Sequence, residues 1–489
     1  MKLALSRKNV WEHLPASLKP MVGPVLGAIS PQYLMGRAFR QTRAFLQESQ
    51  WWPAERTRAF QLDQLRRILS VAHDRTTYYH CSFSAAGFDP RDLRSVDDLA
   101  GLPTIDRQTV RAHLTEMCTT SPHSAKVDYA STGGSSGPPL GFYIGSERSG
   151  IEYAYLVASW ERAGFRLGMP LASLRGRLVR PDARGFHHEY DPLLRQHYYS
   201  NLHMTDDNIA RYFEHIAGIG PCFLHVYPSS AAALANFVRR AGIRPPSNVR
   251  GILAGSENVY PEQRRVVVAT LGYRYFSWYG LTEKVVLAAE CEHSDRYHVW
   301  PNYGVFELLD DGGSPVTRPG GRGEIVGTGF INNVVPFIRY RTGDYATYVG
   351  DHCPECKREH PIIADIRGHR IQEVLVTQDG SLVTWTAVNV HDDTFDRVLH
   401  FQFYQDTPGR AVLRIVPANG FGQADRDRLQ NRIDRKLHQR LEVDLELVES
   451  IPLTRAGKTI YVDQRIAAAM ISDLSLEPEP DSGARAATS

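Results

Sequence analysis

Short apolar runs alternate with helical patterns through the middle of the chain, and this alternation limits the fold more than any other feature. A short apolar run bounded by turn signals is typical of a buried strand, whereas longer periodic segments favour helices. Strands that alternate with helices predict an α/β core with a largely parallel sheet. In the helix at 229–242, Ser229 is expected at the start and Gly242 at the end. The strand-like runs are residues 171–178, 221–226, 249–254 and 273–278, and the helical segments are residues 147–164, 229–242 and 261–271.

The regions before and after this alternating part have different sequence patterns. Residues 1 to about 120 are expected to be mostly helical, with an amphipathic helix at 54–73 and a capped helix at 104–114. Short strands and turns follow from 297 to 348, with one strand expected at 337–340. The expected organisation is an N-terminal extension at 1–50, a large α/β domain with mostly parallel sheets at 51–366, a β-rich subdomain within it at about 297–366, a small mobile α+β domain at 367–471 and a disordered tail at 472–489.

Composition excludes several classes of protein. Hydrophobic residues make up 42% of the 489 residues, which is enough for a sizeable core and excludes global disorder. The net charge of +2 gives no general attraction to nucleic acid. Six cysteines are too few for a disulfide scaffold, so a reducing cytoplasm is the expected location. The apolar stretch at 20–35 contains three prolines and is too short to span a bilayer, although peripheral membrane contact through it stays an alternative.

The segment from Ser131 to Pro139 is the first candidate for chemistry. It holds three glycines, four hydroxyl side chains and two prolines in nine residues. Glycines let successive backbone N–H groups face one concavity, which binds anions such as phosphates. The alternative is an ordinary hairpin loop, since the same residues dominate turns. A nucleotide-binding P-loop is excluded because no lysine follows Gly137, so a bound phosphate needs its cation from elsewhere.

Two further candidates lie at expected strand ends. In Trp278–Glu283, Tyr279 offers an aromatic face, Thr282 a hydroxyl for a phosphate and Glu283 an oxygen ligand for Mg²⁺. The alternative is a strand exit with an incidental acid. In 340–344, Asp344 is suited to accept both hydroxyls of a ribose, unless the Gly-Asp pair forms only an Asx-type turn.

Near the C-terminus, the segment 452–458 has the composition of an exposed loop and ends in Lys458. This lysine is a candidate for the missing cation, and a solvated surface lysine is the alternative.

Taken together, in this order and spacing, the segments resemble the adenylate-forming superfamily of acyl-CoA synthetases and peptide-synthetase adenylation domains. They most resemble the phenylacetate–CoA ligase family, and within it the branch found in capsule and exopolysaccharide gene clusters. The sequence departs from the superfamily pattern at Leu140, where many members carry lysine, and in the hinge, where Gln372 and Glu373 are both candidates. The resemblance implies nucleotide contacts for Thr132, Gly133, Gly134, Ser135, Ser136, Gly137, Gly255, Ser256, Glu257, Tyr279, Gly280, Asp344 and Arg367 (or Arg370), and catalytic roles for Lys458, Glu283 and Thr282.

The function implied is ATP-dependent activation of a carboxylic acid as an acyl adenylate, with Mg²⁺ and release of pyrophosphate, followed by transfer to an acceptor. Coenzyme A is the first candidate acceptor, and an amine or hydroxyl of a polysaccharide precursor is the second. Tyr227 and Trp278 are candidates for the acid pocket, or else plain core. A non-catalytic scaffold with this fold stays a third hypothesis. The expected partners are small molecules, not nucleic acid, and a homodimer is kept as a candidate assembly.

The cysteines form a second constellation. Cys353 and Cys356 are a Cys-x-x-Cys pair, and Cys291 precedes His293 by two residues. Three thiols and an imidazole can form a tetrahedral zinc site, with His293 as the expected fourth ligand and His298 as the competitor. The family resemblance makes a structural zinc plausible here, and four unrelated reduced side chains are the alternative.

Overall fold

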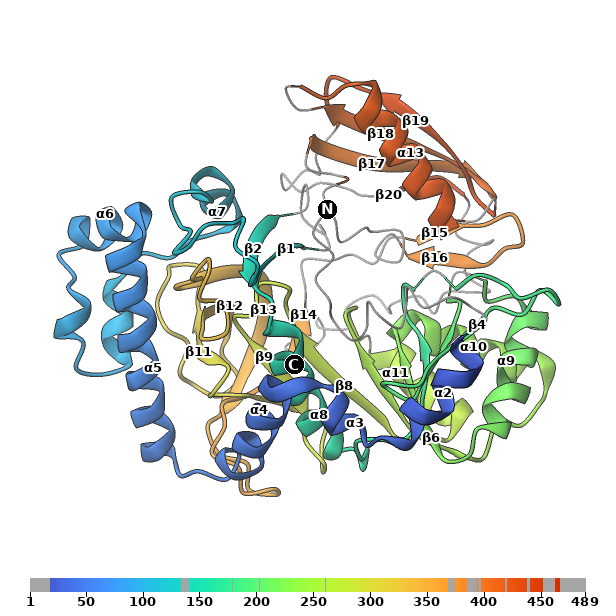
Figure 1. Cartoon of the computed structure of the whole chain (residues 1–489), viewed down its shortest axis with the longest axis horizontal. Coiled ribbons are helices and arrows are strands. Elements are labelled where there is room, and N and C mark those ends of the chain that lie inside the picture. The colour runs from blue at the N-terminus through green and yellow to red at the C-terminus, as the bar shows by residue number, and fades with distance from the viewer. Residues whose placement is uncertain are drawn as a thin grey trace, which may run out of the picture.

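A twelve-stranded mixed sheet forms the centre of the molecule (Figure 1). The computed structural model describes residues 18–132, 140–177, 179–201, 203–259, 261–367, 374–384, 394, 397–417, 420–437, 440–451 and 462–466. In spatial order the strands are β11 (Gly304–Leu309), β12 (Arg322–Gly329), β13 (Tyr340–Gly350), β14 (Ile362–Arg367), β10 (Tyr297–Val299), β9 (Leu287–Glu290), β8 (Tyr275–Gly280), β7 (Val249–Gly255), β6 (Cys222–Val226), β3 (Leu171–Leu174), β5 (Gln196–Tyr199) and β4 (His188–Asp191).

The two halves of this sheet differ in strand direction. One half consists of five adjacent strands that all run in the same direction, in the spatial order β5, β3, β6, β7 and β8. From β8 to β11 every neighbouring pair is antiparallel, as is β4 with β5. The α/β fold class is confirmed, but the sheet is mixed, whereas the sequence predicted mostly parallel strands. The strands of the expected β-rich part continue the same sheet because β9 turns back beside β8.

Helices cover the parallel half. They are α8 (Arg148–Glu161), α9 (Asp206–Gly218), α10 (Pro228–Ala241) and α11 (Pro261–Leu271). The start expected at Ser229 is wrong, because α10 begins at Pro228, and proline is favoured in the first turn since it needs no N–H partner there. The end at Gly242 is confirmed, since this residue has a φ of 63°. Leu224 and Val226 of β6 pack with Leu234 of α10 in one buried core.

The N-terminal part is helical, as expected. Within it, α4 lies against α8, and its Phe39 and Leu46 are buried in a cluster with Trp160. Helix α7 is capped by Asp106, whose carboxylate accepts the Thr109 N–H at 2.7 Å. Among the described residues, no helix combines the length and apolarity needed to cross a bilayer. The elements are α2 (Lys19–Ala28), α3 (Pro31–Leu34), α4 (Gly36–Ser49), α5 (Ala54–Arg75), α6 (Thr77–Ala85), η1 (Pro90–Asp92), η2 (Asp97–Gly101) and α7 (Arg107–His113).

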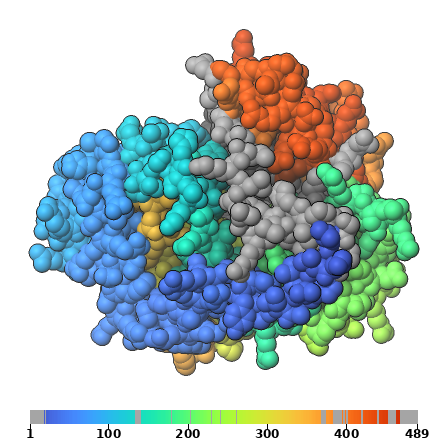
Figure 2. All heavy atoms as spheres, viewed as in Figure 1, coloured from blue at the N-terminus to red at the C-terminus, as the bar shows by residue number. Residues whose placement is uncertain are grey.

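A small α+β unit follows the large sheet. Its four-stranded sheet has the order β19-β18-β17-β20, and α13 buries Leu429, Ile433 and Leu437 in the core of the unit. The unit lies at the top of the molecule in Figure 1 and Figure 2, and the N-terminal helices run along the left and lower sides. The elements are β15 (Val374–Val376) and β16 (Leu382–Thr384), which form a hairpin, then β17 (Val398–Thr407), β18 (Arg410–Pro417), α13 (Gln423–Leu437), β19 (Glu442–Leu447) and β20 (Val462–Gln464).

Candidate active site

A pocket opens at the carboxyl end of β8, where ligands bind in open α/β sheets. It combines residues that follow β7 with residues of β8, β13 and β14, and it includes six residues that the sequence predicted, namely Ser256, Glu257, Trp278, Tyr279, Gly280 and Asp344. Gly255 lies at the end of β7, where a Cβ atom would come within 2.6 Å of the Trp278 ring, so this glycine gives Trp278 room. The full lining is Ser256, Glu257, Asn258, Val259, Ser277, Trp278, Tyr279, Gly280, Leu281, Tyr297, Asp344 and Ile366.

Asp344 is fixed by an irregularity in β13. The expected strand at 337–340 is wrong, because residues 337–339 are irregular and the Asp344 segment opens β13. Gly343 has a φ of 75°, which glycine adopts without strain, and its N–H donates to Glu324 Oε1 at 2.9 Å. The Thr342 hydroxyl donates to the Ile325 carbonyl at 2.7 Å. The Asp344 carboxylate then accepts the Tyr279 hydroxyl at 2.8 Å, so two predicted motifs meet in one pocket.

Glu283 lies in the turn between β8 and β9, and it is buried. Its Oε1 accepts the Tyr340 hydroxyl at 2.9 Å. Burial and the Glu283 carboxylate raise the pKa of Tyr340 well above its ordinary value, so this hydroxyl keeps its proton and donates it. Tyr279 therefore reaches Asp344 while Tyr340, four residues before Asp344, reaches Glu283. These two contacts connect the segment after β8 to β13, although Thr282 and Glu283 are not among the residues that line the pocket.

The glycine-rich segment lies between β1 (Val127–Ser131) and β2 (Gly141–Gly145), which pair with each other in antiparallel orientation. Its base is closed by two contacts: the Thr132 N–H donates to the Leu140 carbonyl, and the Leu140 N–H donates to Thr132 Oγ1, both at 3.0 Å. Leu140 is buried in the core, so this position supplies packing. Gly133, Gly134, Ser135, Ser136 and Gly137 lie outside the described residues.

A half-buried arginine that the sequence analysis did not single out lies near this pocket. Arg175 directly follows β3, and its guanidinium donates to Ser256 Oγ at 2.5 Å and to His225 Nε2. It also lies 5.2 Å from the Tyr227 ring centroid and 5.4 Å from that of Trp278. Burial, and next the Arg175 charge, lower the pKa of His225 well below its usual range, so His225 is a neutral acceptor.

No carboxylate among the described residues forms an ion pair with Arg175. The Trp278 Nε1–H beside it is also buried, with no hydrogen-bond partner in the same part of the chain. The Arg175 guanidinium and the Trp278 N–H, which has no hydrogen-bond partner among the described residues, thus lie together at the carboxyl ends of β3, β6, β7 and β8. The sequence feature that could have identified Arg175 is its position directly after the buried strand β3.

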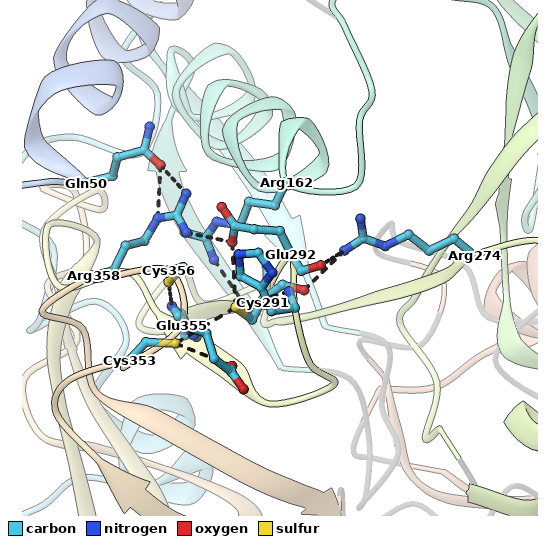
Figure 3. Close-up of polar contacts among 12 residues, drawn as sticks. Gln50, Arg162, Arg274, Cys291, Glu292, Cys353, Glu355, Cys356 and Arg358 are labelled. Atoms are coloured by element: carbon cyan, nitrogen blue, oxygen red, sulfur yellow. Dashed lines mark hydrogen bonds and ion pairs between the residues drawn. The ribbon is translucent and has the colours of Figure 1, made fainter.

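Three thiols and one imidazole meet beside β9, β10 and β14 (Figure 3). One ligand atom each from Cys291, His298, Cys353 and Cys356 lies within 4.8 Å of the others, and all four residues are buried. The expected ligand His293 is exposed and instead donates its backbone N–H to Cys291 Sγ at 3.5 Å. His298, the competitor, takes its place.

The cluster has dimensions that fit a metal. The Cys291 and Cys353 sulfurs are 4.0 Å apart, and Cys356 Sγ is 3.8 Å from His298 Nδ1. Two thiolates on a tetrahedral zinc, each at about 2.3 Å, are about 3.8 Å apart. Burial raises the pKa of Cys291 to about 12.

Charges around the cluster suit an anionic complex. Arg162 lies next to it with Nε and Nη2 buried and unpartnered within the described part of the chain, and burial lowers the pKa of Arg162 to about 9. Three thiolates and one Zn²⁺ carry a net negative charge, which the Arg162 guanidinium complements.

Other predicted residues are only partly placed. Lys458 and the hinge at 368–373, including Arg370, lie outside the described residues. The backbone of Arg367 pairs with Tyr345 in the sheet, directly beside Asp344, but its side chain is not described.

The sequence is similar to that of several known proteins. Residues 375–465 match the CapK C-terminal domain. The chain is 26% identical to the phenylacetate–coenzyme A ligase of Thermus thermophilus over 354 residues, which cover 71% of this chain and 76% of that protein. It is 23% identical to protein CapK of Staphylococcus aureus over 383 residues, covering 76% and 81%. The chain is a homologue of phenylacetate–coenzyme A ligases and of CapK.

Solved structures agree on the fold. A 2-hydroxyisobutyryl-CoA ligase in complex with 2-HIB-AMP and CoA superposes with a TM-score of 0.57 at 19% identity, covering 87% of this chain and 93% of that one. An open conformation of the same ligase gives 0.51 at 18% identity, covering 82% and 90%. The resemblance that the motifs indicated is therefore confirmed at the level of homology and fold.

Proposed function

We propose that this homologue is an ATP-dependent, adenylate-forming acid–thiol ligase. It would activate a carboxylic acid as an acyl adenylate and then transfer the acyl group, with coenzyme A as the first acceptor. The observation that carries the proposal is the pocket in which Tyr279 and Asp344 meet at the carboxyl end of β8. The names of the relatives support the proposal, because four of them are phenylacetate–coenzyme A ligases.

Different described residues would bind different parts of ATP. Asp344 would accept the ribose hydroxyls, and Tyr279 with Glu257 would border the adenine. Glu283 is a buried, oriented carboxylate and would hold Mg²⁺, which supplies charge neutralisation at the phosphates. The acid's carboxylate oxygen would attack the α-phosphorus, forming a P–O bond and releasing pyrophosphate. The acceptor thiol would then attack the acyl carbon, lose its proton and displace AMP. Positioning and charge account for most catalysis in such steps.

The test is ATP–pyrophosphate exchange with a panel of carboxylic acids, followed by mass spectrometry of the adenylates. We expect acid-dependent exchange with at least one member. Absence of exchange with every acid, in protein that binds ATP, would favour the non-catalytic scaffold.

A second acceptor class has its own support. The match of residues 375–465 to the CapK C-terminal domain connects the small unit to CapK, and we propose polysaccharide biosynthesis in the cytoplasm as the alternative setting. The acceptor would then be an amine or hydroxyl. Comparing the free thiol consumed with the AMP produced separates the two, because a coenzyme A ligase consumes one thiol for each AMP.

Arg175 bears on which acid is bound. We expect the best acids to carry a second anionic or hydrogen-bonding group, because among the described residues Arg175 makes no direct ion pair and the Trp278 N–H has no hydrogen-bond partner. Replacing Arg175 with Met should raise KM for such acids about 10- to 100-fold, since a charge-assisted hydrogen bond contributes about 1.5–3 kcal/mol. KM for ATP should change less than about threefold by the same argument.

The matched control for this substitution is Arg177→Met. Arg177 makes an ion pair with Glu189 at 2.8 Å, so it should leave the acid preference unchanged. Equal rises in both KM values for Arg175→Met would show that Arg175 supports the fold and does not bind the acid.

Lys458 is proposed as the residue that bridges the acid carboxylate and the α-phosphate. Lys458→Ala should lower adenylate formation by about 10²-fold or more, as expected when a charge that acts on the transition state is removed. The melting temperature should stay unchanged. Exchange activity within a few-fold of the native protein would contradict the role, and Lys357→Ala serves as a control at an exposed lysine.

We also propose that Cys291, His298, Cys353 and Cys356 hold a structural zinc ion. The spacing of the ligand atoms, the unpartnered His298 Nε2 and the unpartnered nitrogens of Arg162 support it. A closed set of four ligands leaves no position for substrate, so this zinc would stabilise the sheet and take no part in chemistry.

A further inference from the structure

Three histidines from separate elements meet at the outer edge of the large sheet: His188 on β4, His197 on β5 and His215 on α9. One ring nitrogen from each lies within 4.8 Å of the other two, and all three side chains are half-buried. We infer that this histidine cluster binds a divalent transition-metal ion, with zinc as the expected occupant. It is separate from the cysteine cluster and from the nucleotide pocket.

The strand register brings the first two ligands together. His188 pairs with Tyr199, and His197 pairs with Tyr190, in the antiparallel hairpin of β4 and β5. His188 and His197 are therefore diagonal neighbours on one face, because side chains two residues apart on a strand point the same way. His188 Nε2 lies 3.0 Å from His197 Nδ1. Two nitrogens on a tetrahedral zinc, each at about 2.0–2.1 Å, are about 3.3 Å apart, so only small ring rotations are needed.

The third ligand comes from the helix packed on that face. The His215 ring centroid lies 4.2 Å from that of His188 and 5.5 Å from that of His197. His215 Nδ1 is hydrogen-bonded to the Tyr199 hydroxyl at 2.7 Å. Metal-binding histidines usually have such a partner on the second nitrogen, which fixes the ring and leaves Nε2 for the metal.

The ligand type indicates which metals fit. An imidazole binds a metal ion through the lone pair of its neutral form. Three neutral imidazoles favour Zn²⁺, Cu²⁺ or Ni²⁺ over Mg²⁺ or Ca²⁺, which prefer oxygen ligands.

The position of the cluster indicates its role. Strand β4 is the edge strand and lies five strands from β8, which is about 24 Å at the usual strand spacing. A metal there would not reach the nucleotide pocket. It would tie the edge hairpin to α9 in addition to the hydrogen bond between the Tyr199 hydroxyl and His215 Nδ1.

The experiment uses the full chain, stripped of metal with a chelator and titrated with Zn²⁺ alone and Co²⁺ alone. We expect native protein to bind one more equivalent of zinc than His197→Gln or His188→Phe. With Co²⁺, this equivalent should show ligand-field absorption without the thiolate charge-transfer band that the cysteine cluster would give. The two sites are therefore distinguished even if one is absent.

Two variants separate a metal site from a simple stack of rings. His188→Phe keeps an aromatic ring against Phe186 and His215, so a packing role predicts unchanged behaviour, whereas a metal role predicts loss of the second equivalent and of its stabilisation. His113→Gln, at a half-buried histidine elsewhere, is the control and should bind as native protein does. If native protein shows no Co²⁺ absorption free of the thiolate charge-transfer band, or if His188→Phe and His197→Gln bind as much zinc as native protein, the inference is wrong.

Discussion

Asp344→Ala should lower acid-dependent ATP–pyrophosphate exchange by about 10³-fold at subsaturating ATP. The carboxylate is proposed to accept both ribose hydroxyls, and a hydrogen bond to a charged acceptor contributes about 2 kcal/mol, so two contribute about 4 kcal/mol. The loss should fall mainly on KM for ATP, because the ribose is held equally in the ground state and in the transition state. Steady-state exchange kinetics at varied ATP measure this directly.

The control for Asp344→Ala is Tyr279→Phe. This variant removes the hydroxyl that contacts Asp344 at 2.8 Å but keeps the ring and the carboxylate. It should cost tenfold or less, since one orienting contact is lost while both ribose partners stay. Melting temperatures of both variants should remain near that of the native protein. An Asp344→Ala variant with KM for ATP within about threefold of native would end the ribose assignment and, with it, the proposed use of the pocket.

Much of the fold follows from local pattern. The apolar runs correctly predicted β3, β6, β7 and β8, because buried parallel strands must be apolar on both faces. Strands β4 and β5 were missed, because their residues are His, Glu, Tyr, Asp and Gln, which carry no apolar signal. The union of both halves in one sheet was also missed, since strand pairing over long separations leaves no trace in periodicity.

The site shows the same limit. Tyr279 and Asp344 were predicted as partners of one ligand, and the structure brings them together at 2.8 Å. Arg175 was missed because its role depends on four strands ending at the same edge. His293 was favoured as zinc ligand because it is near Cys291 in sequence, but the chain reverses after it. Cys291 N–H bonds to the Arg296 carbonyl, and His298 returns on β10 opposite Ala289, which places it beside the thiols.

Replacing both Cys353 and Cys356 with Ser should remove one equivalent of zinc and lower the melting temperature by about 6–12 °C. Structural zinc contributes folding free energy directly, and a loss of about 3 kcal/mol corresponds to such a shift at about 2–4 °C per kcal/mol. The loss has a second cause: Arg162 and the buried Arg358 would face an uncharged cluster in place of an anionic one. Metal content by mass spectrometry and a thermal melt measure the two effects.

The matched control is Cys222→Ser, which makes the same atomic change at a buried cysteine in the other core. It should keep the full zinc content and cost only about 1–2 kcal/mol for a buried hydroxyl. A chelator should lower the melting temperature of native protein and of Cys222→Ser. In the double variant it should have a smaller effect, limited to metal held elsewhere. Native protein without zinc, or a double variant that retains the full amount, would contradict the site. In that case the pairing of β9, β10 and β14 would depend on packing and backbone hydrogen bonds alone, and the buried charge of Arg162 would need a different counterpart.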